Sequence, residues 1–181
     1  MGMDDKEISA LVAQAQRDPA AFGALYDHYV KAVYRYHANR VGDAEDAQDL
    51  TAQTFLAALE ALPRYRHRGT FAAWLFQIAR SKAMDFFRRR RAQTSIEQAE
   101  ARAPQDLLVH IAEVDQLRIL LRGLADDERE LLNLRYVAEL KLSEIAAVFG
   151  KSEDAVKKSL YRLLARLQQQ VEAHDERQAS D

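Results

Sequence analysis

The 181-residue sequence contains no cysteine and has little glycine or proline, with six and three residues respectively. The absence of cysteine excludes disulfide bonds, thiolate metal sites and cysteine nucleophiles. The shortage of turn-forming residues favours long helices over a sandwich or barrel with many turns. There is no apolar run of 18 residues and no apolar signal core near the acidic N-terminus. We therefore expect an all-α, cytoplasmic chain without membrane insertion.

The charge of the chain is unevenly distributed, although the net charge is only −2. Residues 60–91 carry nine basic and two acidic side chains, and residues 151–170 carry five basic and two acidic ones. Because a local field decides polyanion binding more than the total charge does, these two segments are candidate nucleic-acid surfaces.

Helical periodicity divides the chain into two predicted domains, residues 5–92 and residues 113–172, joined by a linker over residues 93–112. Within the first domain, Asp43 and Thr70 are suited to cap helices, and Pro63 is expected to stop one. In the second domain we expect a cap near Asp126 or Asp127. The fold class predicted is two all-helical domains, the C-terminal one a helix-turn-helix.

The helix-turn-helix is predicted from residues 142–167. A short apolar helix ends at Gly150, which can adopt the left-handed turn, and Ser152 can cap a second helix. One side of that helix is apolar, and Lys158, Arg162 and Arg166 fall on the opposite side. A second helix with a basic outer face is typical of major-groove readers. The alternative is two ordinary amphipathic helices with a solvated basic face.

The other basic segment mixes cations with aromatic side chains, which suits an opened nucleic-acid strand because aromatic faces stack on unpaired bases. Its cations include a run of four arginines, Arg88 to Arg91, at the end of a predicted helix. The alternative for Trp74 is a place in the core, since it shares core spacing with Phe71 and Ile78.

Three segments resemble, in the same order, those of sigma-70 family factors. Residues 43–56, DAEDAQDLTAQTFL, resemble the segment that binds core polymerase. Residues 71–80, FAAWLFQIAR, with the arginine run that follows, resemble the promoter −10 segment, and residues 142–160 resemble the −35-reading helix-turn-helix. The two-domain length is similar to that of the extracytoplasmic-function (ECF, group 4) sigma factors.

The resemblance implies three sets of site residues and the partners core RNA polymerase and promoter DNA. The set implied for polymerase binding is Asp43, Asp46, Asp49, Leu50, Gln53 and Thr54. The set implied for −10 DNA is Arg64, Tyr65, Arg66, Arg68, Trp74, Gln77, Arg80, Ser81, Lys82, Arg88, Arg89, Arg90 and Arg91. The set implied for −35 DNA is Lys151, Ser152, Glu153, Asp154, Lys157, Lys158, Tyr161 and Arg162.

Two departures from the family pattern affect base preference. Ser81 stands where the family usually has asparagine, and a single hydroxyl cannot make the paired contacts of an amide. At the recognition helix, the family's Gly-Thr-Val-Lys-Ser is replaced here by residues 154–158, DAVKK. The resemblance therefore implies a sigma factor without fixing the promoter sequence, and the family commonly has an anti-sigma partner.

Other functions remain open at this point. A helix-turn-helix regulator that is not a polymerase subunit would share the C-terminal pattern, and polymerase binding separates the two. A helical-bundle enzyme is disfavoured because His28, His37, His67, His110 and His174 form no Glu-x-x-His or His-Glu-x-x-His motif. We expect His28 and His37 to pack in the fold, and we predict a protein that is not an enzyme and uses neither a metal nor a cofactor.

Overall fold

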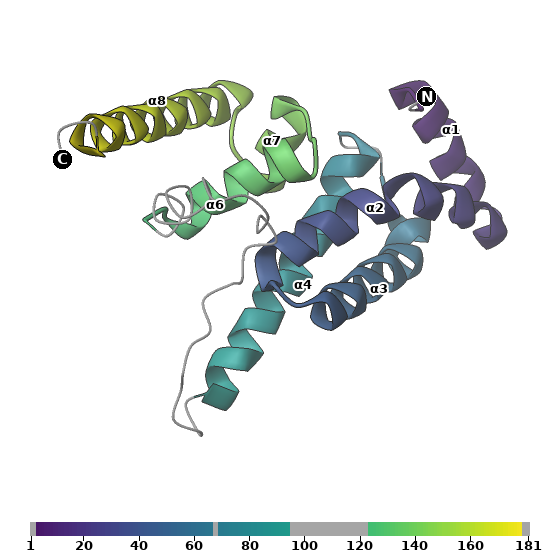
Figure 1. The fold of residues 1–181 in the computed structure, drawn as a ribbon. Helices are drawn as coiled ribbons and strands as arrows, with labels where there is room; N and C mark the ends of the chain where they lie inside the picture. The colour runs from purple at the N-terminus through teal and green to yellow at the C-terminus, as the bar shows by residue number, and fades with distance from the viewer. Residues whose placement is uncertain (1–2, 67–68, 95–122, 179–181) are drawn as a thin grey trace.

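The computed structural model describes residues 3–66, 69–94 and 123–178, and every regular element in these ranges is helical. The elements are α1 (Asp5–Ala15), α2 (Phe22–Val41), α3 (Ala44–Ala61), α4 (Phe71–Thr94), α6 (Asp126–Leu132), α7 (Leu142–Phe149) and α8 (Glu153–Gln178), with short 3₁₀ turns at Pro19–Ala21 and Leu62–Arg64 and a π-helical turn at Asn133–Val137. The all-helical prediction is confirmed (Figure 1).

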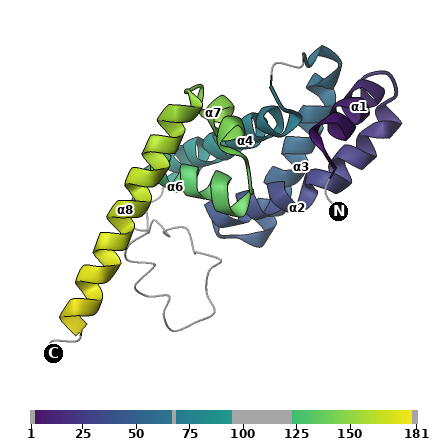
Figure 2. The same cartoon turned by 90° about the horizontal axis from the view of Figure 1, so that it is seen from above.

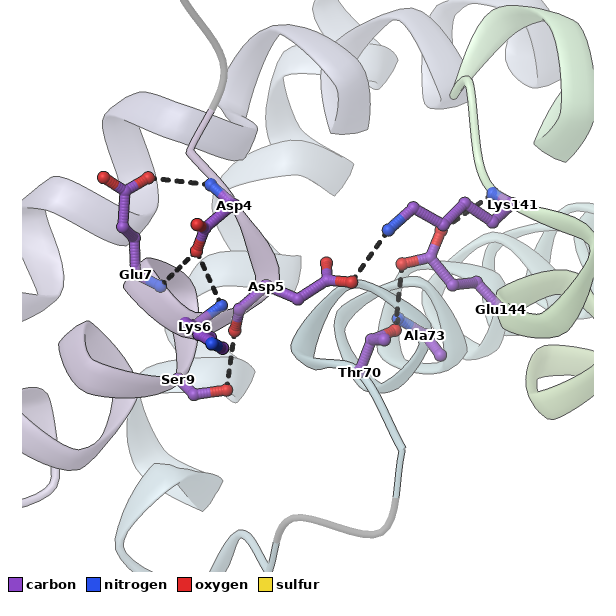
Figure 3. Close-up of polar contacts among 9 residues, drawn as sticks. All are labelled: Asp4, Asp5, Lys6, Glu7, Ser9, Thr70, Ala73, Lys141 and Glu144. Carbon is purple, nitrogen blue, oxygen red and sulfur yellow. Dashed lines mark hydrogen bonds and ion pairs between the residues drawn. The ribbon is translucent and has the colours of Figure 1, made fainter.

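The helix starts follow from short acidic or hydroxyl side chains. Asp43 accepts hydrogen bonds from the amides of Glu45 and Asp46 at 2.9 and 3.0 Å, which confirms it as the cap of α3. Asp4 caps α1 in the same way, and Glu7 returns a bond by accepting from the Asp4 amide at 2.7 Å (Figure 3). Thr70 accepts from the Ala73 amide at 3.3 Å at the start of α4.

The helix ends also follow local chemistry. Gly42 and Gly150 adopt left-handed φ values of 71° and 64° directly after α2 and α7, where a side chain would add strain. Pro63 lies in the 3₁₀ turn that follows α3, as expected for a residue that ends a helix. The cap predicted near Asp126 or Asp127 is wrong by one or two positions. The cap is Ala125, whose amide donates to Glu128 at 3.1 Å.

The N-terminal part is a bundle in which α2 packs against α1, α3 and α4 (Figures 1 and 2). Its centre contains Leu25, Val33, Tyr36, Phe55 and Phe76, all with under 5% of their surface exposed. Edge-to-face rings join the helices; for example, the centroids of Tyr36 and Phe76 lie 5.6 Å apart. These apolar faces are the ones that the three- and four-residue spacing predicts.

The C-terminal part contains the predicted helix-turn-helix. Ile145 and Val148 of α7 and Val156 and Leu160 of α8 are buried and hold the two helices together. Ser152 accepts from the Ala155 amide at 3.3 Å, which confirms the predicted cap of the second helix. The long α8 extends away from the rest of the molecule, so most of its surface faces solvent (Figure 2).

The two parts pack against each other, which the sequence pattern did not predict. The helix α7 lies on α4, and the π-helical turn lies on α2. Leu134 and Ile145 belong to the same buried apolar cluster as Tyr36 and Phe76. The predicted linker, residues 93–112, and the first ten residues of the second predicted domain lie almost wholly outside the described residues.

Candidate nucleic-acid interface

The start of α8 presents the predicted −35 surface to solvent. All eight predicted residues at positions 151–154, 157, 158, 161 and 162 are exposed, and Tyr161 exposes 60% of its surface. The apolar face of the helix is turned inward through Val156, Leu160 and Leu163. The outward face therefore carries the cations Lys157, Lys158 and Arg162 where base edges or phosphates can reach them.

Arg166, one turn further along α8, differs from these cations. Its guanidinium donates to Glu128 of α6 at 2.7 Å, and this ion pair raises its pKa and lowers that of Glu128. Among the ion pairs of the described residues, none holds Lys158 or Arg162. The basic face of α8 therefore has two halves. Lys158 and Arg162 are available to a partner, whereas Arg166 forms an ion pair with Glu128.

The predicted −10 surface begins at an aromatic group before and within α4. The ring of Tyr65 lies 4.6 Å from that of Trp74 and 5.9 Å from that of Phe71, measured between centroids. Tyr65 is buried, and burial raises the pKa of its phenol. Trp74 is half-buried, so the structure places it partly in the core and partly at the surface. Arg64 and Arg66 are exposed on either side of Tyr65, and Arg68 lies outside the described residues.

The C-terminal part covers the middle of this surface. Gln77 donates to the backbone carbonyl of Ala147 at 2.8 Å. Arg80 lies 3.7 Å from Glu130 and 3.9 Å from Asp127, and it stacks over the ring of Phe149 at 5.3 Å. Two side chains predicted to contact −10 DNA are thus already engaged by the chain itself.

Glu130 is the centre of this contact between the two parts. It exposes only 2% of its surface, accepts from the Tyr36 hydroxyl at 2.8 Å, and forms an ion pair with Arg40. Nearby, the Asn133 amide donates to the Tyr36 carbonyl at 3.1 Å and its oxygen accepts from Asn39 at 3.1 Å. A buried carboxylate needs such partners to offset its lost hydration.

Two further contacts reinforce the same interface near the start of α4. The Thr70 hydroxyl donates to Glu144 at 3.0 Å, so the residue that caps α4 is itself held by α7 (Figure 3). Lys141 forms a 2.8 Å ion pair with Asp5 of α1 (Figure 3). Sequence reasoning missed the interface because Glu130, Asn133 and Glu144 follow ordinary amphipathic spacing, and no pattern in either part identifies its partner.

The remaining predicted −10 residues lie toward the end of α4. Ser81 is exposed and Lys82 is half-exposed. The arginine run from Arg88 to Arg91 is exposed, with Arg88 paired to Asp85 at 2.9 Å and Arg90 placed 3.8 Å from Asp46 of α3. The end of α4 is therefore a cationic surface that borders the acidic side of α3.

The predicted polymerase-binding residues follow one stripe of α3. Asp43, Asp49 and Gln53 are exposed, and Asp46 is half-exposed. An open pocket between α3 and α4 is lined by Asp46, Leu50, Gln53, Phe86, Arg89 and Arg90. This pocket brings the acidic stripe next to two arginines that were assigned to DNA, which sequence distance alone did not indicate.

One predicted contact residue is corrected by the structure. Thr54 is fully buried, and its hydroxyl donates to the Leu50 carbonyl at 2.7 Å and lies 3.0 Å from Nε2 of His37. It supports α3 from inside and cannot touch a partner. Leu50 exposes only 3% of its surface, and that small part lines the pocket.

The histidines within the described side chains pack as expected. The ring of His28 lies 4.6 Å from that of Tyr29, and the ring of His37 lies 5.2 Å from that of Tyr36. His67, His110 and the side chain of His174 lie outside what the structure describes. Over the described residues, no group of acidic or histidine side chains could hold a metal ion, and no helix is long and apolar enough to cross a membrane.

The arrangement defines a two-part helical protein with an exposed recognition helix. Comparison with known proteins narrows the class. The family model of sigma-70 region 2 matches residues 25–93, and that of sigma-70, region 4 matches residues 115–167. The ECF RNA polymerase sigma factor SigD of Mycobacterium tuberculosis is 35% identical over 186 residues, covering 96% of this chain and 88% of SigD.

Two further similarities agree with this result. The ECF RNA polymerase sigma factor BldN of Streptomyces coelicolor is 36% identical over 173 residues, covering 91% of this chain and 66% of BldN. The solved structure of CnrH in complex with the cytosolic domain of CnrY has a TM-score of 0.69 at 28% identity and covers 92% of this chain and 97% of that one. The chain belongs to the ECF RNA polymerase sigma factors of the sigma-70 family.

Proposed function

We propose that this sigma factor divides its work among three surfaces. The start of α8 reads the −35 duplex, the loop before α4 and the exposed side of α4 hold the opened −10 strand, and the acidic stripe of α3 docks on core RNA polymerase. The observation that carries the proposal is the full exposure of the predicted recognition face on a helix whose other side is buried. The protein acts as a regulatory subunit in the cytoplasm and is not itself an enzyme.

The packing of the C-terminal part on the N-terminal bundle, here called the closed arrangement, implies an order in which the partners bind. The α3 stripe and the α8 face are both exposed, so polymerase and −35 DNA can bind without any rearrangement. Gln77 and Arg80 are held by Ala147, Asp127 and Glu130, so binding of the −10 strand requires the two parts to separate.

A protein partner that keeps the factor inactive is also part of the proposal. The support is the similarity to CnrH, whose solved structure contains the cytosolic domain of CnrY. The similarity suggests a second chain that binds this sigma factor and is released before polymerase binds. Co-purification of the tagged factor from its own cells, followed by mass spectrometry, tests whether such a partner exists.

Charge reversal on α3 should weaken polymerase binding without unfolding the chain. Replacing both Asp46 and Asp49 with lysine inverts the acidic stripe, and we expect at least a tenfold loss of affinity for core polymerase. Substitutions of exposed residues usually change stability by only about 0.5 kcal/mol, and losing the surface ion pair of Asp46 with Arg90 adds a similarly small cost, so the loss of affinity should not come from unfolding. The affinity is measured by fluorescence anisotropy with labelled factor.

The matched control for this prediction is Asp27→Lys, a reversal of an exposed acid on the neighbouring α2. Asp27→Lys should bind polymerase as the wild type does, and circular dichroism should be unchanged in all variants. Equal affinity of the double variant and the wild type would contradict the α3 assignment.

Arg162 and Arg89 should affect DNA binding in different ways. Arg162→Ala should cost about 1–3 kcal/mol and relax preference at one −35 position, because a recognition-helix guanidinium reaches base edges. Arg89→Ala should weaken binding about evenly on all sequences and lower the salt slope by about one unit, because it meets phosphates. Holoenzyme binding to −35 variants at two salt concentrations distinguishes these patterns. If Arg162→Ala weakened every sequence equally, Arg162 would be a phosphate contact.

A further inference from the structure

Gln16, at the C-terminal end of α1, makes an unusual pair of contacts with the loop before α4. Its side-chain amide nitrogen donates to the backbone carbonyl of Leu62 at 3.0 Å and to that of Tyr65 at 2.8 Å. An amide group carries two N–H donors, so both are used on the same loop. The position lies outside residues 25–93, the part of the chain that the region 2 family model matches.

The two carbonyls belong to the 3₁₀ turn at Leu62–Arg64 and to the residue directly after it. The Leu62 carbonyl also accepts from the Tyr65 amide at 3.0 Å, which closes the turn from inside. The Tyr65 carbonyl points to Gln16, which fixes the orientation of the peptide unit that leads to Arg66. The amide of Gln16 therefore determines where the chain leaves the turn.

The fixed turn orients side chains of the proposed −10 surface. It places the Tyr65 ring 4.6 Å from Trp74, where it packs against the indole and holds it half-exposed. It also places Arg64 and Arg66 at the surface on either side of this aromatic pair. Aromatic faces and cations at fixed relative positions are what an unpaired base and its phosphates require.

The support for Gln16 is itself rigid. Ile8, Val12 and Ala15 bury one side of α1 in the core, so the end of the helix cannot move independently of the bundle. The glutamine therefore adds a polar anchor to a loop whose Leu62 and Tyr65 side chains are already buried in the core. The two hydrogen bonds join residues 46 and 49 positions apart. Neither α1 nor the 3₁₀ turn needs them in order to form.

We propose that Gln16 is a positioning residue for the −10 strand: it holds the loop so that the buried Tyr65 packs behind Trp74, and Trp74 and the flanking arginines face the opened DNA. The inference rests on the proposed function of that loop. Gln16 touches no DNA in this account and acts only through the two carbonyls.

The single tryptophan of the chain, Trp74, makes the loop position measurable. Gln16→Met keeps the length and apolar packing of the side chain but removes both donors. Gln16→Glu keeps the shape and places an acceptor against two carbonyls. In the free full-length chain, we expect the Trp74 emission to shift to longer wavelength in both variants, because the Tyr65 ring no longer covers the indole.

The functional readout is holoenzyme binding to a promoter with a pre-opened −10 segment, with binding to an isolated −35 duplex measured in parallel. We expect about a tenfold loss on the opened promoter for Gln16→Met, a larger loss for Gln16→Glu, and no change on the −35 duplex or in polymerase affinity. Gln14→Met, an exposed glutamine of the same helix, is the matched control and should behave as the wild type.

The outcomes separate this inference from the proposed function. Unchanged Trp74 emission and unchanged opened-promoter binding in Gln16→Met would overturn the positioning role while leaving the −10 assignment in place. Equal losses of affinity for the −35 duplex and for polymerase would show that Gln16 has a general structural role, and this result would also overturn the positioning role. If the wild-type holoenzyme failed to bind the opened segment, the proposed function of the loop would fail, and the positioning role with it.

Discussion

Replacing Glu130 with alanine should open the free chain and increase its affinity for opened −10 DNA. Glu130 joins the two parts through the Tyr36 hydroxyl and the guanidinium groups of Arg40 and Arg80. Without the carboxylate, the guanidinium groups of Arg40 and Arg80 and the buried Tyr36 hydroxyl lose their shared acceptor. Removing one partner of a buried ion pair costs roughly 3 kcal/mol, so the contact between the two parts should weaken.

The released side chains are the reason for the gain in DNA binding. Arg80 and Gln77 are both bonded to the C-terminal part at this interface, and separation of the two parts frees both polar groups together. We expect a larger radius of gyration in small-angle scattering and at least a tenfold rise in affinity of the free factor for a −10 single strand. Binding to a −35 duplex should not change, because the α8 face is exposed already.

Asp126→Ala is the matched control for this experiment, since Asp126 is an exposed acid of the same helix. It should leave both the scattering profile and the strand affinity at wild-type values. An unchanged profile and unchanged strand affinity in Glu130→Ala would contradict the view that this carboxylate keeps the −10 surface covered.

The N-terminal bundle should lose stability in acid because of His37. Its ring is fully buried between Tyr36 and Thr54, and burial, together with the nearby Arg40 charge, lowers its pKa from 6.5 to about 3. The His37 imidazole therefore becomes protonated below about pH 6.5 in the unfolded chain, but it stays neutral in the folded chain until the pH approaches 3. The stabilisation is present above pH 6.5 and is lost progressively as the pH falls toward 3, by about 4 kcal/mol over the range.

The measurement is urea unfolding at pH 7, 5.5 and 4.5, followed by circular dichroism. His37→Gln cannot take up the proton, so its unfolding free energy should depend less steeply on pH. Between pH 6 and 4, the difference in slope should correspond to nearly one bound proton. A wild-type slope in His37→Gln would assign the acid sensitivity to other groups.

The parts of the fold that depend on local chemistry could be predicted from the sequence. Asp43, Thr70 and Ser152 begin helices because each has a short side chain that reaches the free amides of the next turn. Gly150 separates α7 and α8 because it accepts a positive φ. The recognition face of α8 is exposed as expected, since its apolar spacing fixes which side is buried.

The parts that depend on contacts between distant segments could not be predicted. Thr54 belongs to the segment that resembles the polymerase-binding motif, but the helix turns it inward onto His37. Glu130 and Gln16 look like ordinary surface residues until packing brings them to Arg40 and to the Leu62 turn. Neither composition nor periodicity encodes which polar side chain meets which distant carbonyl.

The central claim is that this chain directs core RNA polymerase to promoters through the α8 face and the α4 surface. Run-off transcription with purified core polymerase, the wild-type chain and a template library randomised at the −35 and −10 segments tests it most directly. We expect factor-dependent transcripts enriched in one −35 and one −10 sequence, with the −35 enrichment relaxed at one position by Arg162→Ala. Transcription no greater than that of core polymerase alone, or without any sequence enrichment, would contradict it.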